Sequence, residues 1–362
     1  MFNKKKMSVI LGCAFVVLAF VSFTCSGAWA SAAKKPLPRS MTIATLPKGT
    51  GNNTLGAAIA KVLTANLKIS VTDRPSGGYA RFVPKVDKGQ MDMAVGHPSV
   101  PYYGYRGTWS FKGKPLFNIR QLAACNPLLS TWIASKKSGI KTFADFKGKR
   151  VAISKSLSGG AFYADTKIIW KYYGLDIEKD IKMVPIPSPS AGARALIEGR
   201  VDIGHVMAGT PIAQEAEIAL GGLNWIFETP EQTKATAEEQ IAAEILPDSL
   251  KCYEGLKGLP GKACFSTTGI AFMAHKDLDE EHAYIIVKTL WENIKDIQAT
   301  HPGLKRWDRE RAFVYPEADF GGIYHPGAIR FYKEVGKWTP EAEARNQWVI
   351  KKYEESKKKH GK

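Results

Sequence analysis

The chain has 362 residues, of which 44% are hydrophobic and 23% are charged, a composition typical of a globular protein large enough for two domains. Its formal net charge is +17. The lysines are dispersed and no nucleic-acid-binding motif is present, so solubility, contact with the cell envelope or attraction of an anionic ligand explains this charge better than nucleic acid does.

The first thirty residues have the pattern of a secretory signal peptide. Lys4, Lys5 and Lys6 precede an apolar run from Val9 to Val21, and Ala28-Trp29-Ala30 supplies a small-residue cleavage pattern. The alternative, an uncleaved membrane anchor, would need an apolar run of roughly twenty residues, and this run is shorter. We therefore expect cleavage after Ala30 and export to the periplasm, which leaves a mature protein with a net charge of about +14.

Export also decides how the cysteines are interpreted. Cys252 and Cys264 lie twelve residues apart in a segment rich in Gly, Pro and Lys, and an exported protein permits a disulfide between them. Such a bridge would contribute about 3 kcal/mol. Cys125 would then be a buried thiol. No metal-binding spacing of Cys or His is present, so we expect no metal site.

The first part of the mature chain alternates between strand and helix patterns. A strand from Met41 to Leu46 is followed by a Gly-rich turn and a helix with its apolar residues on one face, and a second strand spans Lys68 to Thr72. This alternation predicts an α/β domain with a mostly parallel sheet, in which ligands gather at the carboxyl ends of the strands.

One segment is followed by a similar segment about 110 residues later. In the first, Ser76-Gly77-Gly78 opens a helix that ends at Gly89 and leads to a strand from Met91 to Val95 and a loop with His97. A helix that begins there would favour an anion at its N-terminus, although Ser76 would serve equally as a simple N-cap.

The second copy repeats the order of small residues, helix, Gly and strand. Ser190 and Gly192 open it, Gly199 to Ile203 matches Gly89 to Met93, and His205 follows. The repetition predicts two similar halves that face one cleft.

The remaining elements continue the α/β pattern. Strands are expected at 150–153, 184–187 and 269–274, and 230–259 is expected to be irregular or a surface helix. The aromatic residues of the helical segment at 280–302 have helical spacing and are expected in the core. The chain ends in a basic, solvated tail.

The motifs give no support for catalysis. The segment Gly49 to Gly56 resembles a dinucleotide fingerprint, with Asp73 as a candidate ribose-binding carboxylate, but Thr54 occupies the position of the third glycine and the exported compartment offers little nicotinamide cofactor. No P-loop and no nucleophile elbow is present. Asp92 and Asp202 are interpreted as caps that precede strands. We expect no enzymatic activity and no cofactor.

Taken together, these segments resemble the TAXI-type substrate-binding proteins of TRAP transporters. The resemblance runs from Met41 to about Gly336. It is carried by Leu55-Gly56, Ser76-Gly77-Gly78, the strand that leads to Tyr102-Tyr103, the run SGIKTFADFKGKRVAIS with Ser158-Gly159-Gly160, and by Ala208-Gly209, KDLDEEHAYIIVKTLWEN and His325-Pro326-Gly327-Ala328.

The resemblance implies a two-lobed periplasmic binding protein fold of the Venus-flytrap type, α/β in class, that closes on a small carboxylate and delivers it to a membrane permease. The expected divisions are a first lobe at 31–128, a second lobe at 129–266, a return to the first lobe at 267–340 and a C-terminal helix and tail at 341–362. Asn52-Asn53, Tyr79 and His97-Pro98-Ser99 depart from the family pattern, so the pocket is expected to be rebuilt around a different ligand.

The expected function is therefore that of a monomeric solute-binding protein. The residues expected to line its ligand site are Thr50, Gly51, Asn52, Asn53, Ser76, Gly77, Gly78, His97 and Tyr102 on one wall and Ser158, Gly159, Gly160, Met207, Ala208, Gly209 and Thr210 on the other. His97 is either a ligand contact, with affinity then dependent on pH near neutrality, or a buried structural residue. The alternatives are a sensor protein that works with a histidine kinase and an exported oxidoreductase.

Overall fold

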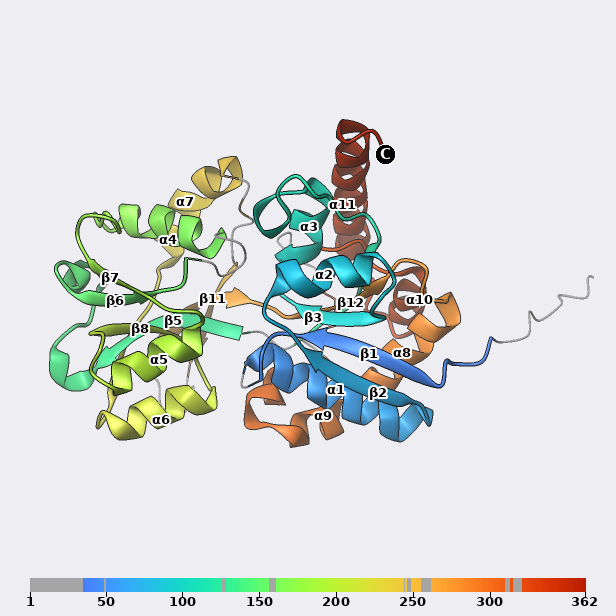
Figure 1. Ribbon diagram of the computed structural model, residues 1–362, viewed down its shortest axis with the longest axis horizontal. Helices are drawn as coiled ribbons and strands as arrows, with labels where there is room; N and C mark the ends of the chain where they lie inside the picture. Colours follow the sequence, from blue (N-terminus) through green and yellow to red (C-terminus); the bar gives the residue numbers. More distant parts are fainter. Residues whose placement is uncertain are drawn as a thin grey trace, which may run out of the picture. The chain divides into compact units, whose positions relative to one another are not determined.

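The computed structural model describes residues 35–362 except 49, 126–127, 156–160, 244, 246–248, 255–261, 310–312 and 315–320. The predicted signal peptide lies outside the described residues. Pro36–Lys362 form one compact unit that contains two mixed sheets, each covered by helices (Figure 1). The predicted α/β fold is confirmed.

The first sheet has the strand order β2-β1-β3-β12-β4. Its strands are β1 (Ser40–Thr45), β2 (Ser70–Pro75), β3 (Met93–Gly96), β4 (Ile119–Ala124) and β12 (Ala271–His275). The helices associated with it are α1 (Gly51–Leu67), α2 (Tyr79–Asp87), α3 (Ser99–Arg106), α8 (Glu280–Glu292), α9 (Ile294–Thr300), α10 (Pro326–Glu334) and α11 (Pro340–Lys359), with short 3-10 turns η1 (Trp109–Phe111) and η5 (Pro302–Arg306).

The second sheet has the order β10-β11-β5-β8-β6-β7, and β9 pairs with β5. Its strands are β5 (Leu128–Ser135), β6 (Arg150–Ile153), β7 (Lys182–Pro185), β8 (Ile203–Met207), β9 (Leu223–Ile226), β10 (Ser249–Glu254) and β11 (Lys262–Thr268). The accompanying helices are α4 (Ala161–Tyr172), α5 (Pro189–Ile197), α6 (Pro211–Ala219) and α7 (Pro230–Ala242), with 3-10 turns η2 (Lys136–Ser138) and η3 (Phe143–Phe146).

The chain crosses between the sheets twice. It passes from the first to the second between β4 and β5 and returns between β11 and β12. The residue limits of the lobes given above stay a prediction.

The two sheets contain the repeated unit that the sequence indicated. In both, three parallel strands have the order second, first, third: β2-β1-β3 and β7-β6-β8. Gly89 and Gly199 have φ angles of 67° and 71°, a left-handed conformation that ends the helix before the third strand in each copy. The repeated sequence pattern therefore corresponds to a repeated strand arrangement.

The aspartate of each copy bonds to the first strand of its unit, where the sequence predicted a cap of the turn before the third strand. An Asp92 carboxylate oxygen accepts a hydrogen bond of 2.8 Å from the backbone N–H of Thr42, and an Asp202 oxygen accepts one of 2.8 Å from the N–H of Arg150. Each carboxylate thus ties the start of the third strand to the first strand. The same geometry in both units explains why Gly-x-x-Asp occurs twice.

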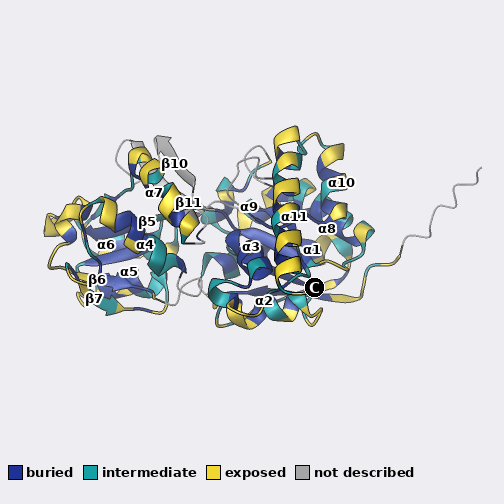
Figure 2. Cartoon of the chain, turned by 90° about the horizontal axis from the view of Figure 1, so that it is seen from above, coloured by how far each residue is buried: buried dark blue, intermediate teal, exposed yellow. Residues whose placement is uncertain are grey.

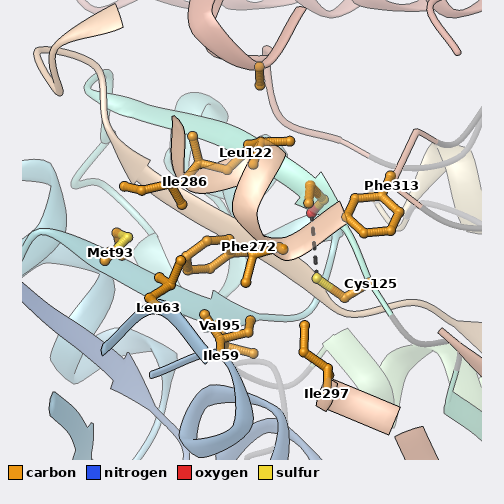
Figure 3. Close-up of a cluster of buried hydrophobic side chains, with 14 of the residues drawn as sticks. Ile59, Leu63, Met93, Val95, Leu122, Cys125, Phe272, Ile286, Ile297 and Phe313 are labelled. Carbon is orange, nitrogen blue, oxygen red and sulfur yellow. Dashed lines mark hydrogen bonds between the residues drawn. The ribbon is translucent and has the colours of Figure 1, made fainter. Parts of the chain in front are cut away.

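The core of the first sheet is built from residues of strands and helices far apart in sequence. Figure 3 shows Phe272 of β12 among Ile59 and Leu63 of α1 and Val95 of β3, all buried. Cys125 is also buried here, with Sγ 3.9 Å from the Ala123 carbonyl oxygen, and burial raises its pKa. Figure 2 shows buried residues concentrated in the strands and exposed residues along the outer sides of helices such as α11.

The start of helix α5 differs from the sequence prediction, and so does part of the region after residue 230. Helix α5 begins at Pro189 with Ser188 as its N-cap, whose Oγ accepts a hydrogen bond of 3.2 Å from the N–H of Ala191, so Ser190 lies inside the helix. Proline is favoured at the first helical position, which moves the start upstream. The region after 230 was expected to be irregular or a surface helix; it forms α7 and then the strand β10.

The backbone register makes the predicted disulfide testable. Cys252 of β10 and Cys264 of β11 are direct partners across an antiparallel pair. Cα atoms of such partners lie about 4.5–5.5 Å apart, within the range that a disulfide bridges. We expect the mature protein exported to the periplasm to be two mass units lighter by intact mass spectrometry before reduction than after it. The variant Cys264→Ser should show no such difference, and full alkylation of both thiols without reduction would contradict the bridge.

Candidate functional site

The described residues of the predicted site lie at the carboxyl ends of parallel strands. Residues 50–53 follow β1, 76–78 follow β2 and His97 follows β3, while Met207 ends β8 and 208–210 follow it. The carboxyl ends of parallel strands are where ligands bind in α/β sheets. Ser158, Gly159 and Gly160 lie outside the described residues.

The N-terminus of α1 is fixed by side chains. Thr50 is its N-cap: Oγ1 accepts a hydrogen bond of 3.2 Å from the N–H of Asn53 and donates one of 2.8 Å to the Pro47 carbonyl. The Asn53 side-chain amide donates to Thr45 Oγ1 at 3.1 Å and to Asp73 Oδ2 at 3.0 Å. Both donors of Asn53 and a carboxylate oxygen of Asp73 are therefore used within the protein, which gives Asp73 a structural role.

Asn52 has a different environment from its neighbour. It is only 5% exposed, and its Nδ2 has no hydrogen-bond partner among the described residues. An unsatisfied buried donor costs about 1–3 kcal/mol, so such groups in folded proteins often have a functional reason. Asn52 is therefore a candidate ligand contact.

Tyr79, the first residue of α2, lies beside Asn52. Its ring packs at the end of β3, where a Cβ on Gly96 would be 3.4 Å from the ring. Burial raises the pKa of Tyr79 well above its usual range, while the backbone amide of His97 and the side-chain amide of Asn52, both next to its hydroxyl, lower that pKa. Tyr79 is thus a protonated phenol at the carboxyl end of the sheet. The sequence identified it only as a departure from the family pattern.

The loop of Ser76, Gly77 and Gly78 is not capped as predicted. The N-cap of α2 is Gly78, with φ 138°, and no side chain caps the helix. The Ser76 N–H instead donates to the Thr45 carbonyl at 2.8 Å, which joins the loop to β1. The Ser N-cap prediction is wrong because the helix begins two residues later, at a backbone angle open mainly to glycine.

A cation covers this loop. A Cβ on Gly77 would be 3.5 Å from Nε and Nη1 of Arg81, so the guanidinium lies against the backbone of the loop. Arg81 is exposed and forms no ion pair within the described part of the chain. Ser76 also lines a surface hollow of about 480 Å³ that it shares with Arg74 and Lys85.

His97 is neutral at physiological pH. Its Nδ1 is 2.6 Å from Ser99 Oγ, and burial lowers its pKa to about 4. The lowered pKa argues against a change of affinity near neutrality through His97, and its contact with a ligand stays a prediction. Its counterpart His205 is 3% exposed, is bonded to Ser130 Oγ at 2.5 Å and packs on Trp132, and burial lowers its pKa to about 3.

Tyr102 has a packing role in α3. Its ring stacks on Trp348 of α11, with ring centroids 6.0 Å apart and planes 11° apart, and the Arg106 guanidinium lies 5.6 Å from its centroid. These contacts occupy most of its surface. Its predicted ligand contact stays a proposal.

The loop after β8 meets a residue that sequence reasoning missed. Arg306 of η5 donates from Nη2 to the Ala208 carbonyl at 3.1 Å. Gly209 has φ 78°, and a Cβ there would be 2.5 Å from Arg306 Nη2, so only glycine admits this contact. Nothing local in the sequence links Arg306 to a loop about a hundred residues earlier.

Ser154, directly after β6, was also missed. It is 2% exposed and its Oγ has no hydrogen-bond partner among the described residues. Ser154 directly follows the first strand of the second repeated unit, and Asn52 lies in the helix that follows the first strand of the first unit. No group of three or more His, Cys, Asp or Glu side chains in the described residues is arranged to hold a metal ion, and none of the described helices has the length and apolar character of a membrane span.

Comparison with known proteins places this architecture in a family. The sequence model of the NMT1-like family matches residues 43–336, which is most of the chain. The chain belongs to the NMT1-like family. The matched region contains both repeated units and ends before α11, and the narrower TAXI resemblance stays a prediction.

Solved structures that this chain resembles include two described as periplasmic binding proteins, BugD and SsuA. BugD has 14% identity over 90% of this chain and 99% of its own, with a TM-score of 0.48. PhnD1 from Prochlorococcus marinus, solved with methylphosphonate, has 12% identity over 83% and 100%, also with 0.48. The aliphatic sulphonate binding protein SsuA from Escherichia coli has 16% identity over 88% and 84%, with 0.39. At these values the three proteins do not identify a ligand for this member of the NMT1-like family.

Proposed function

We propose that this protein is the periplasmic solute-binding subunit of a membrane transporter and that it captures a small organic anion, in its narrowest form a carboxylate delivered to a TRAP-type permease. The observation that carries the proposal is a pair of buried, unsatisfied polar atoms, Asn52 Nδ2 and Ser154 Oγ, one in each repeated unit. Each follows the first strand of its unit. A bound ligand that reaches both would supply the missing partners and stabilise the liganded state.

Charge supports an anionic ligand. Arg81 covers the 76–78 loop and Arg306 contacts the Ala208 carbonyl, so each predicted wall has a guanidinium beside it. The N-terminus of α1 adds backbone N–H groups that favour negative charge. Guanidinium groups bind carboxylates in a two-point geometry, which fits the proposed substrate class.

A thermal-shift screen of residues 31–362 against mono- and dicarboxylates, amino acids and sulfonates tests the function. An acid present at a thousand times its dissociation constant should stabilise the protein by about 4 kcal/mol. For that acid, Asn52→Ala should weaken binding by about 5–100-fold, since a buried ligand oxygen left without its hydrogen-bond donor costs about 1–3 kcal/mol.

The matched control lies on the same helix. Asn66 of α1 has its side-chain amide bonded to the Val62 carbonyl at 2.8 Å, so Asn66→Ala should leave affinity unchanged. Ser154→Ala tests the second unit and should also weaken binding. Absence of a shift with every anion, or equal effects of Asn52→Ala and Asn66→Ala, would contradict the proposed site.

A further inference from the structure

The wall formed by Asn52, Tyr79 and His97 contains no charged group. Asn52 is an amide, His97 is neutral because burial lowers its pKa, and burial keeps the Tyr79 phenol protonated. The cation nearest to this wall in sequence is Arg81, which lies against Gly77. The first lobe thus presents two kinds of recognition surface, a cationic loop and a neutral wall.

The neutral wall is rich in hydrogen-bond donors. Asn52 Nδ2 has no partner, and the Tyr79 hydroxyl lies next to it and next to the His97 backbone amide. A phenol O–H can donate a hydrogen bond, so Tyr79 offers a second donor beside Asn52 Nδ2. Asn52 is 5% exposed and Tyr79 is 8% exposed, so bulk water reaches little of either side chain.

Backbone geometry holds Tyr79 in this place. A Cβ at position 96 would meet the Tyr79 ring at 3.4 Å and the Met273 Cε at 3.0 Å, so the absence of one leaves room for the ring at the end of β3. On its other side the ring packs edge-on against Phe82, with centroids 5.7 Å apart. The hydroxyl is therefore carried by a ring that packing fixes, as precise recognition requires.

We infer that the Asn52 amide and the Tyr79 hydroxyl together bind one uncharged oxygen of the ligand, a keto or hydroxyl oxygen, apart from the group that carries its charge. This inference rests on the proposed function and narrows it to oxygen-substituted organic acids. Tyr79 is then the residue that distinguishes such an acid from the same acid without the oxygen. A site built to hydrogen-bond an oxygen discriminates strongly against its absence, because the buried donors are then left without a partner.

Matched pairs of acids test the inference by calorimetric titration of residues 31–362. The probes are glutarate with 2-oxoglutarate, succinate with malate, and propionate with lactate and pyruvate. The wild-type protein should bind the oxygenated member of at least one set ten times or more tighter than the unsubstituted acid. Tyr79→Phe, which keeps the ring, should bind both members within threefold of each other, with the affinity for the unsubstituted acid unchanged.

Two further variants complete the test. Asn52→Ala should reduce the preference in the same way, which keeps the inference testable if Tyr79→Phe fails to fold. Tyr172→Phe changes a tyrosine that is 45% exposed on α4 and should retain the preference. If Tyr79→Phe keeps the wild-type preference, or loses affinity equally for both members, the inference is wrong while the proposed function stands. If the wild type binds none of these acids, the inference is wrong, and a shift with another anion in the thermal screen would then preserve the proposed function alone.

Discussion

Replacing Gly327 by alanine is expected to lower the free energy of unfolding by at least about 3 kcal/mol. Gly327 lies in the first turn of α10, where that helix crosses α8, and a Cβ there would overlap the Glu280 carbonyl oxygen and lie 2.8 Å from the Tyr284 backbone nitrogen. Both are backbone atoms of α8 and cannot rotate away. The helices would have to separate and open the core beneath them.

Gly104→Ala is the matched control for this change. Gly104 is a buried helical glycine of α3, and a Cβ there would be 3.5 Å from Leu116 at closest, an ordinary contact distance. Alanine is a better helix former than glycine by about 1 kcal/mol, so stability should hold or rise. Urea unfolding followed by circular dichroism measures both variants. Equal stability of the two would show that α8 and α10 are not packed as closely as described.

Acidification is expected to destabilise the protein through His205, which is buried, and His97, which is partly buried. Burial lowers the pKa of His205 to about 3 and that of His97 to about 4 from an ordinary 6.5. Below pH 6.5 the unfolded chain therefore binds protons that the folded chain does not, and stability falls as pH falls. Between pH 7.5 and 4.5 each histidine should contribute a loss on the order of 2–3 kcal/mol.

Urea titrations at the two pH values measure this loss. His205→Gln should reduce the pH-dependent loss by about half, whatever its effect at neutral pH. Ser130→Ala removes the hydroxyl 2.5 Å from His205 Nε2 but leaves the ring buried, so the pH dependence should persist. The explanation would be wrong if His205→Gln and the wild type lost the same stability on acidification.

The sequence predicted the features that depend on local pattern. The strand and helix alternation and the ends of two helices next to Gly89 and Gly199 follow from neighbouring residues, and the structure has them. Helix starts were less certain, because Ser76 and Ser190 are favourable N-caps by residue type. The backbone conformation of Gly78 and the proline at position 189 instead determine where helices α2 and α5 begin.

The candidate site depended on contacts between distant segments. Asn52 and Asn53 are adjacent and identical in type. The Asn53 side chain is hydrogen-bonded to Thr45 and Asp73, whereas Asn52 Nδ2 has no hydrogen-bond partner among the described residues. The difference arises from the direction in which each leaves the first turn of α1. Neither Arg306 nor Ser154 belongs to a recognisable sequence motif. Only the burial of Ser154 in the structure identifies it as a candidate site residue.

Helix α11 lies outside the stretch that the NMT1-like family shares, yet residues inside that stretch rely on it. The Tyr324 backbone N–H donates to Asn346 Oδ1 at 2.9 Å, and the carbonyls of Tyr105 and Phe117 accept from Ser356 and Tyr353. The limit of homology at residue 336 is thus not a limit of folding. A chain shortened at that residue would leave these main-chain groups without hydrogen-bond partners and would expose the aromatic rings of α3. The end of the family match therefore does not mark a boundary at which this protein can be truncated.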